Sequence, residues 1–181
     1  MEGERFFVVD FEFTCWRGRP PKGMVQEILD IGFVEIDLVN KKIIKQDKFL
    51  IKPEMSNVSN FCTKLTSITN EQVEKHGISL YKAFSHLDSK YNLKESHWGS
   101  WGVFDKTHLT KECKLKGVEF PFSKNHKDIQ KCFSKLQQNK NRLYSVENAL
   151  KEIGIQFEGT PHRADIDAYN TAIICLNMSK L

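Results

Sequence analysis

The sequence is organised around one stretch, Phe6-Phe7-Val8-Val9-Asp10-Phe11-Glu12-Phe13-Thr14-Cys15-Trp16. It begins as an apolar run and then alternates apolar and acidic residues, which is the two-residue period of a β-strand. Asp10 and Glu12 therefore share one face of this strand. Unpaired carboxylates are costly to bury, and a hard divalent cation with oxygen ligands suits two adjacent ones. On this pattern alone a solvated strand end is the commoner explanation, so a metal site depends on residues later in the chain.

Two further strands are predicted directly after this one. Residues 26–37 and 42–51 are rich in isoleucine, valine and phenylalanine, and a short polar turn separates them. Together with the first strand they predict an antiparallel three-stranded meander. The basic segment 17–22 contains glycine and prolines, which predicts a loop. The sequence leaves open whether this loop stacks on a base, as aromatic and basic groups do in single-strand binding, or only covers the site.

The remainder of the chain has the periodicity of helices, interrupted by one short strand within residues 96–102. Cap residues and glycines mark the helix ends. We predict helices that begin after Thr69, after Ser79, near Asp105, over residues 126–138, after Ser145, and at Thr160-Pro161. This order predicts an α/β fold with a mixed central sheet that begins with the meander and is flanked by helices, in a single domain over residues 1–181.

Composition limits the class of protein. A chain of 181 residues fits one domain. Its five cysteines are scattered and contain no C-x-x-C pair, so neither a disulfide framework nor a zinc site is indicated, and a reducing compartment is expected. No apolar run approaches membrane-spanning length, and the acidic N-terminus runs straight into the first strand without a signal peptide. We therefore expect a soluble cytoplasmic protein with no membrane partner.

The positive charge is concentrated in one part of the chain. Residues 106–142 hold 10 basic and 3 acidic side chains, whereas residues 1–105 hold 14 and 15, and residues 143–181 hold 3 and 5. A local basic surplus beside a balanced domain indicates contact with a polyanion. A solvated lysine-rich helix face is the alternative explanation.

Asp105, His162 and Asp167 gain meaning only in combination. Alone, Asp105 is explained as a helix N-cap, and the other two as ordinary residues in the first turns of the last helix. On a helix, the five-residue spacing of His162 and Asp167 separates them by about 140° around the axis and about 7.5 Å along it, so that both can flank one pocket. With Asp10 and Glu12, four carboxylates are then available for two divalent ions about 3.5 to 4 Å apart, the arrangement that stabilises both reacting oxygens of a phosphodiester.

Charge balance supports this combination. Two divalent cations neutralise four carboxylates. Because a phosphate is itself negatively charged, only the site with both cations bound tolerates one. Without metal, each close carboxylate pair costs about 4 kcal/mol at 4 Å and an effective dielectric constant of 20. The empty site is therefore expected to be loose. Asp165 is expected to be solvated and outside the site.

Four ordered motifs in this sequence resemble those of the DEDDh 3′→5′ exonucleases, most of all the branch with the histone-mRNA 3′ exonuclease and the bacterial KinA-pathway-inhibitor-like nucleases. They are Asp-Phe-Glu-Phe-Thr-Cys-Trp at 10–16, Phe-Cys-Thr-Lys-Leu-Thr-Ser-Ile-Thr at 61–69, Ser-Trp-Gly-Val-Phe-Asp at 100–105 and His-Arg-Ala-Asp-Ile-Asp at 162–167. The resemblance covers about residues 5–178. Two positions depart from it: Ser67 stands where relatives commonly have glycine, and Asp165-Ile166-Asp167 replaces the commoner Leu-Asp-Asp.

The resemblance implies an RNase H-like fold and a role for each of these motifs. Asp10, Glu12, Asp105 and Asp167 would bind two Mg²⁺ or Mn²⁺ ions, and His162 would be the general base that deprotonates the attacking water. The pocket for the 3′-terminal nucleotide would be lined by Phe11, Thr14, Leu65 and Thr66.

The basic stretch is expected to contact phosphates upstream of the 3′ end. Its candidate residues are Lys106, Lys111, Lys114, Lys127, Lys131 and Lys135. The predicted function is a metal-dependent 3′→5′ exonuclease that releases nucleoside 5′-monophosphates from single-stranded RNA. One alternative is a DNA exonuclease, since the choice of sugar depends on a contact to the 2′-hydroxyl. The other is a non-catalytic binder of nucleic acid or protein, although the presence of all five catalytic positions counts against it.

Overall fold

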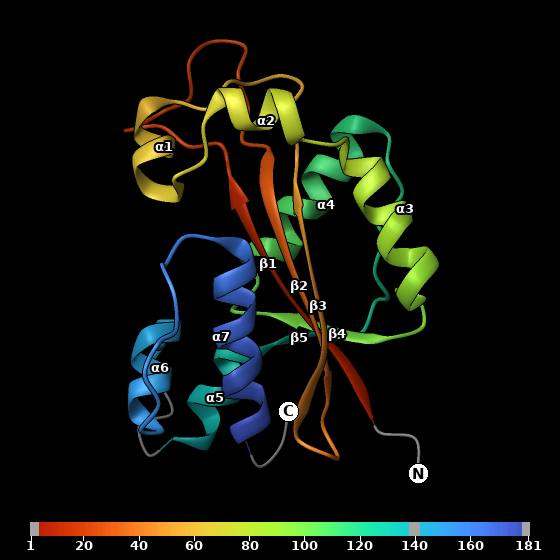
Figure 1. The fold of residues 1–181 in the computed structure, drawn as a ribbon, viewed down its shortest axis with the longest axis vertical. Helices are drawn as coiled ribbons and strands as arrows, with labels where there is room; N and C mark the ends of the chain where they lie inside the picture. Colours follow the sequence, from red (N-terminus) through yellow and green to blue (C-terminus); the bar gives the residue numbers. More distant parts are fainter. Residues whose placement is uncertain (1–3, 138–141, 179–181) are drawn as a thin grey trace.

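The computed structural model describes residues 4–137 and 142–178. Its centre is a five-stranded sheet in the order β3-β2-β1-β4-β5 (Figure 1). The strands are β1 Arg5–Phe13, β2 Ile28–Asp37, β3 Lys42–Leu50, β4 His97–Ser100 and β5 His126–Asp128. The first three form the predicted antiparallel meander, and β4 and β5 continue the sheet in parallel. The predicted mixed α/β sheet is confirmed.

Helices cover both faces of this sheet (Figure 1). They are α1 Asn60–Thr66, α2 Asn70–His76, α3 Leu80–Tyr91, α4 Phe104–Lys116, α5 Ile129–Leu136, α6 Val146–Glu152 and α7 Ala164–Asn177. One face packs against α3 and α4, and the other against α5, α6 and α7. Figure 1 places α1 and α2 beyond the C-terminal end of β1. Among the described residues, no helix is long and apolar enough to cross a membrane.

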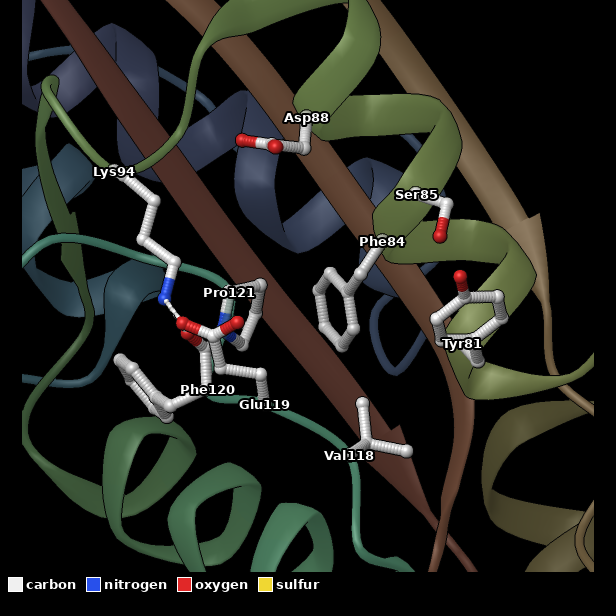
Figure 2. Close-up of a pocket in the computed structure, with 9 residues that line it drawn as sticks. All are labelled: Tyr81, Phe84, Ser85, Asp88, Lys94, Val118, Glu119, Phe120 and Pro121. Atoms are coloured by element: carbon white, nitrogen blue, oxygen red, sulfur yellow. Dashed lines mark hydrogen bonds and ion pairs between the residues drawn. The ribbon is translucent and has the colours of Figure 1, made fainter.

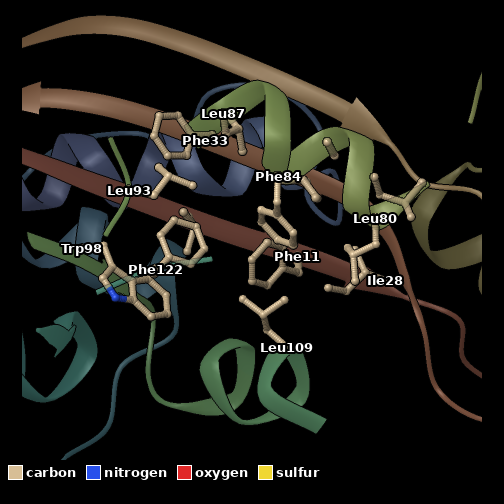
Figure 3. Packing of buried hydrophobic residues seen from close by; sticks show 14 of the residues in the cluster. Phe11, Ile28, Phe33, Leu80, Phe84, Leu87, Leu93, Trp98, Leu109 and Phe122 are labelled. Atoms are coloured by element: carbon tan, nitrogen blue, oxygen red, sulfur yellow. The ribbon is translucent and has the colours of Figure 1, made fainter. Parts of the chain in front are cut away.

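The alternation in β1 decides which side chains reach which face. Phe7 and Phe11 enter the core under α3 and α4, where the ring of Phe11 lies 6.4 Å from that of Phe84 (Figure 3). Phe6 and Val8 enter the core under α7. Each fully buried side chain of this kind contributes roughly 1.5–3 kcal/mol. Because Asp10 and Glu12 have the same parity as Phe6 and Val8, they belong to the α7 face.

Several predicted helix starts are confirmed by their caps. Thr69 accepts a hydrogen bond from the backbone N–H of Gln72, and the side-chain oxygen of Gln72 accepts one from the backbone N–H of Thr69. Ser79 and Ser145 cap α3 and α6 in the same way through their hydroxyls.

Two predicted helix starts are wrong. The last helix begins at Ala164 instead of Thr160-Pro161, because His162 has a left-handed φ of 65° that cannot continue a helix. In the predicted helix over residues 126–138, the first three residues pair with β4 as strand β5, and the helix starts at Ile129. Position 138 lies outside the described residues.

A buried ion cluster fixes α4 to the start of β2. The Lys116 ammonium lies 3.0 Å from Glu27 and 2.9 Å from Glu112. Glu112 also accepts a hydrogen bond from the backbone N–H of Ile28 at 2.8 Å. Breaking a buried pair of this kind by removing one partner typically costs about 3–5 kcal/mol. The cluster therefore locks the helix that carries Asp105 against the sheet.

The C-cap of α1 generates a stability prediction. Ser67 occupies the left-handed region with φ 61° and ψ 12°, where a Cβ atom is unfavourable. We expect Ser67→Gly to stabilise the protein by about 1 kcal/mol in urea denaturation. The matched control is Ser89→Gly inside α3, which is expected to destabilise, since glycine is a poor residue for a helix interior. Equal effects of the two substitutions would contradict the assignment of strain to Ser67.

Candidate active site

Three carboxylates meet at one point between the sheet and α7. Asp10 and Glu12 come from β1, and Asp167 comes from the first turn of α7. Each offers an oxygen that lies within 4.8 Å of the other two. All three side chains are half-buried, so they are open to a ligand from one side. We call these three residues the acidic cluster.

The close approach of α7 to the sheet depends on Gly32. Gly32 in β2 is the cross-strand partner of Asp10. A Cβ atom built on Gly32 would lie 1.8 Å from the carbonyl oxygen of Ala164, the first residue of α7. The helix therefore rests directly on the backbone of β2, and this contact brings Asp167 down to the level of Asp10.

Two acidic residues hold the segment that precedes α7. Asp167 accepts hydrogen bonds from the backbone N–H groups of His162 at 2.8 Å and Arg163 at 3.2 Å. Asp30, the cross-strand partner of Glu12, is only 2% exposed and lies 3.3 Å from the guanidinium Nε of Arg163. His162 thus occupies a fixed, left-handed position outside the helix, so the helical angle expected between it and Asp167 does not apply.

Asp105 lies behind the acidic cluster. It is in the first turn of α4 and not at the N-cap, which is Val103. Asp105 is only 6% exposed. Its carboxylate accepts a hydrogen bond from the backbone N–H of Phe11 at 3.2 Å. Its charge acts on Asp10, but Asp105 is not among the carboxylates whose oxygens lie within 4.8 Å of one another. The structure therefore brings together three of the four predicted metal ligands and places the fourth beside them.

The cluster strongly favours protonation when no cation is present. Burial, followed by the charges of Asp105 and Asp167, raises the pKa of Asp10 well above its usual value. Burial and the charge of Asp167 raise the pKa of Glu12 to about 8, against a small opposing effect of Arg163. Burial also raises the pKa of Asp105 to about 7 and, less strongly, that of Asp167. Burial is the largest cause in each case, and for Asp10 and Glu12 the charges of neighbouring carboxylates raise the pKa further.

The donor set fits a hard divalent cation. No lysine or arginine among the described residues forms an ion pair with Asp10, Glu12 or Asp167. A set of carboxylate oxygens alone suits hard divalent cations such as Mg²⁺, Mn²⁺ or Ca²⁺ and not a soft metal. Two such ions, as predicted from the sequence, remain a prediction.

The residues predicted to line the nucleotide pocket differ in accessibility. The side chains of Phe11, Thr14 and Thr66 are buried. The Thr14 hydroxyl accepts from the backbone N–H of Glu27, and that of Thr66 donates to the carbonyl of Cys62, so both are already used inside the protein. Leu65 is 39% exposed. The role of these four residues at a nucleotide stays a prediction.

The predicted phosphate contacts remain accessible. Lys127 on β5 and Lys131 in α5 are exposed, Lys106 in α4 is half-buried, and none of them forms an ion pair with a described residue. Lys111, Lys114 and Lys135 are likewise exposed. By contrast, Asp165, expected to be solvated, lies 3.0 Å from the ammonium of Lys48 and is partly buried.

Sequence reasoning missed three residues of this site: Asp30, Gly32 and Arg163. A carboxylate inside the fully buried strand β2 and a glycine in its middle were both visible as signals. The first indicates a specific cationic partner, and the second a close backbone approach. Arg163 carried no signal, because only the fold places it beside Asp30.

Comparison with known proteins agrees with this geometry. Residues 7–175 match the model of the Exonuclease (RNase_T) family. The chain belongs to the DEDDh exonuclease family. The human 3′-5′ exoribonuclease 1 is 26% identical over 94% of this chain, and the chain spans about half, 51%, of that relative's length. The Bacillus subtilis protein named probable 3′-5′ exonuclease KapD is 24% identical over 93% of this chain and 81% of its own.

A solved member of the family has the same fold. The nuclease domain of 3′hExo, a DEDDh family member crystallised with rAMP, superposes with a TM-score of 0.87 at 25% identity, over 97% of this chain and 92% of its own. The predicted RNase H-like architecture of this family is therefore confirmed.

The raised pKa values predict a pH-dependent stability of the metal-free protein. Between the unfolded value of 4.5 and the folded value of about 8, Glu12 stays protonated in the folded protein while the unfolded chain has released its proton. The free energy of unfolding must therefore fall as the pH rises through this window. Urea denaturation of chelator-treated protein at pH 5 and pH 8 measures the difference, and Mn²⁺ should restore stability at pH 8.

Asp10→Asn is the control for this experiment. It removes one of the repelling charges, so the variant should be more stable than the wild type at pH 8 without metal and should gain less from Mn²⁺. A wild type with equal stability at both pH values would contradict the electrostatic account.

The contact at Gly32 predicts that one substitution lowers both the stability of the protein and its stabilisation by Mn²⁺. In Gly32→Ala the new methyl group overlaps the Ala164 carbonyl, so α7 must move away from β2. We expect a loss of about 1–3 kcal/mol in stability, together with a weaker stabilisation by Mn²⁺ because Asp167 moves with the helix. Urea denaturation with and without Mn²⁺ measures both effects. A variant that loses neither would show that α7 is not held by this contact.

Proposed function

We propose that this chain is a metal-dependent 3′→5′ exonuclease that acts on single-stranded RNA and releases nucleoside 5′-monophosphates. The observation that carries the proposal is the acidic cluster: three carboxylates held together without a cationic partner among the described residues. A protein gains nothing in stability from such an arrangement, so its natural explanation is a site for divalent cations at which phosphodiester chemistry occurs.

Each residue of the site has a defined task in the proposed reaction. Divalent cations, when bound, offset the negative charge of the carboxylates and polarise the scissile phosphate. Asp10, Glu12 and Asp167 hold their oxygens in place for them, and Asp105, fixed by the backbone of Phe11, completes the set from behind. The four carboxylates thus define where the scissile phosphate must lie.

His162 is proposed as the general base. Its imidazole is exposed and close enough to Asp167 to oppose the rise that burial causes in the pKa of that carboxyl group, while its backbone N–H donates to the same residue. From this position it takes a proton from the attacking water. The water oxygen bonds to phosphorus, the bond from phosphorus to the 3′-oxygen breaks, and that oxygen takes a proton from solvent to become the new 3′-hydroxyl of the shortened strand.

The proposed preference for RNA rests on the relatives. The human relative is named an exoribonuclease, and the matching 3′hExo nuclease domain was crystallised with a ribonucleotide, rAMP. We propose that Lys106, Lys127 and Lys131 contact phosphates farther upstream, since they are not neutralised within the described protein. Leu65 is proposed to contact the 3′-terminal nucleotide.

A time course on 5′-labelled single-stranded RNA and DNA of the same sequence tests the proposal. In Mn²⁺ we expect a ladder that shortens from the 3′ end, faster on RNA, and none with EDTA. His162→Ala should lower the rate by about 10²- to 10⁴-fold, the usual contribution of a general base.

Asp10→Asn is the matched control, because it replaces one carboxylate oxygen by an amide nitrogen at almost unchanged size and so removes a proposed metal ligand. Faster loss of DNA than RNA would reassign the substrate to DNA. A ladder unaffected by EDTA and by Asp10→Asn would overturn the metal-dependent mechanism, and no ladder on either strand would favour a binding protein.

A further inference from the structure

A cavity lies between α1 and Arg17, a residue of the segment after β1. Its volume is about 460 Å³, within the range of small-molecule sites. It is lined by Arg17, Asn60, Phe61, Lys64 and Leu65. We call it the α1 cavity.

Hydrogen bonds connect this cavity to the strand that carries the acidic cluster. The thiol of Cys62 in α1 donates to the carbonyl of Phe13 at 3.3 Å, and the hydroxyl of Ser59 donates to the carbonyl of Cys15 at 2.6 Å. Helix α1 is thus docked on the residues that directly follow Glu12. Arg17 is five residues beyond Glu12, a distance of at most about 18 Å along an extended chain. The α1 cavity is therefore within a few nucleotides of the acidic cluster.

The chemistry of the α1 cavity suits one nucleotide of a single strand. Phe61 is 42% exposed and Leu65 is 39% exposed, which is a large apolar surface for a helix of this size. An exposed aromatic ring is a platform on which any base can stack. Arg17 and Lys64 supply two positive charges, and neither forms an ion pair with a described residue. A phosphate placed between Arg17 and Lys64 would form charge-assisted hydrogen bonds with both side chains.

A smaller cavity, of about 140 Å³, lacks this combination. It lies between α3 and the segment after α4, and Figure 2 shows Tyr81 at its rim and the ammonium of Lys94 paired with Glu119. Asp88 adds a further negative charge to its lining. Its cation is thus already neutralised, so charge complementarity to a polyanion distinguishes the α1 cavity from it.

We infer that the α1 cavity binds the nucleotide on the 5′ side of the one being released, with its base against Phe61 and its phosphate between Arg17 and Lys64. This inference rests on the proposed function, because it places the cavity along the strand that enters the acidic cluster. It makes Phe61, Arg17 and Lys64 residues of substrate binding and not of chemistry.

Two substrates separate binding in this cavity from the chemistry. The p-nitrophenyl ester of uridine 5′-monophosphate contains only the nucleotide that is released, whereas a 10-nucleotide RNA also fills the α1 cavity. We expect Phe61→Ala to lower kcat/KM on the RNA by about 5- to 100-fold through KM. The double variant Arg17→Gln, Lys64→Gln should act in the same direction and reduce the salt dependence of KM. Neither should change hydrolysis of the ester.

Tyr81→Ala is the matched control, because Tyr81 is an aromatic side chain on the rim of the other cavity and is 66% exposed. It should leave both substrates unaffected. If Phe61→Ala behaves like Tyr81→Ala, or lowers hydrolysis of the ester as much as that of the RNA, the inference is overturned while the exonuclease proposal stands.

A binding measurement keeps the two proposals distinguishable. If the wild type hydrolyses neither substrate, the proposed function fails. Fluorescence anisotropy of a labelled 10-nucleotide RNA with His162→Ala protein in Mn²⁺ then decides the inference alone. The second substitution is introduced into the His162→Ala protein. Weaker RNA binding by the variant that also carries Phe61→Ala, and unchanged binding by the one that also carries Tyr81→Ala, supports the α1 cavity as a nucleotide site. Equal binding by all three proteins overturns it.

Discussion

The mutual repulsion of the acidic cluster is the constraint on which the rest of the structure depends. Asp10, Glu12 and Asp167 bring oxygens within 4.8 Å of one another in a half-buried place. At an effective dielectric constant of 20, each pair that is ionised opposes folding by about 4 kcal/mol at 4 Å, and without a cation protonation of Glu12 below about pH 8 avoids part of this cost. The fold must supply this energy from elsewhere, and it does so from both sides: β1 is the middle strand of the sheet, and α7 is pressed onto β2 at Gly32.

The supports of the cluster lie at different depths in the fold. Buried aromatic residues on one face of β1 pack against α3 and α4, and this packing fixes the direction in which Asp10 and Glu12 point. The ion cluster around Lys116 anchors α4, which in turn fixes Asp105 behind β1. A second ion pair, Arg163 with Asp30, anchors the other end of the site. Rigid elements therefore position each side chain, as a site that must oppose repulsion requires.

The sequence predicted those parts of the fold that local patterns determine. The alternation in β1 predicted a strand with Asp10 and Glu12 on one face, and the cap at Thr69 predicted the start of α2. The start of α7 could not be predicted in this way. Thr160-Pro161 is a strong local start signal, but tertiary hydrogen bonds to Asp167 hold His162 in a left-handed conformation and delay the helix. Contacts that form only in the folded protein therefore outweighed the local helix propensity at this position.

The same distinction applies to the candidate site. The motif residues identified the carboxylates, because their chemical type and order are visible in the chain. Burial was not visible in the motif, so the pattern did not indicate that the side chain of Phe11 belongs to the core. The role of Arg163 was not visible either, because it depends on Asp30, a partner in β2 that is 133 residues away in the sequence.

The left-handed backbone at His162 makes the site sensitive to helix length. Asp167 is both a member of the acidic cluster and the acceptor for the N–H groups of His162 and Arg163. If α7 were extended by one turn at its N-terminus, these N–H groups would enter the helix and the imidazole would rotate away from the carboxylates. All five side chains would still be present in the sequence, yet the histidine and the acids would no longer share a site. In a protein of this kind, an intact motif is therefore insufficient to establish activity without the correct helix boundary.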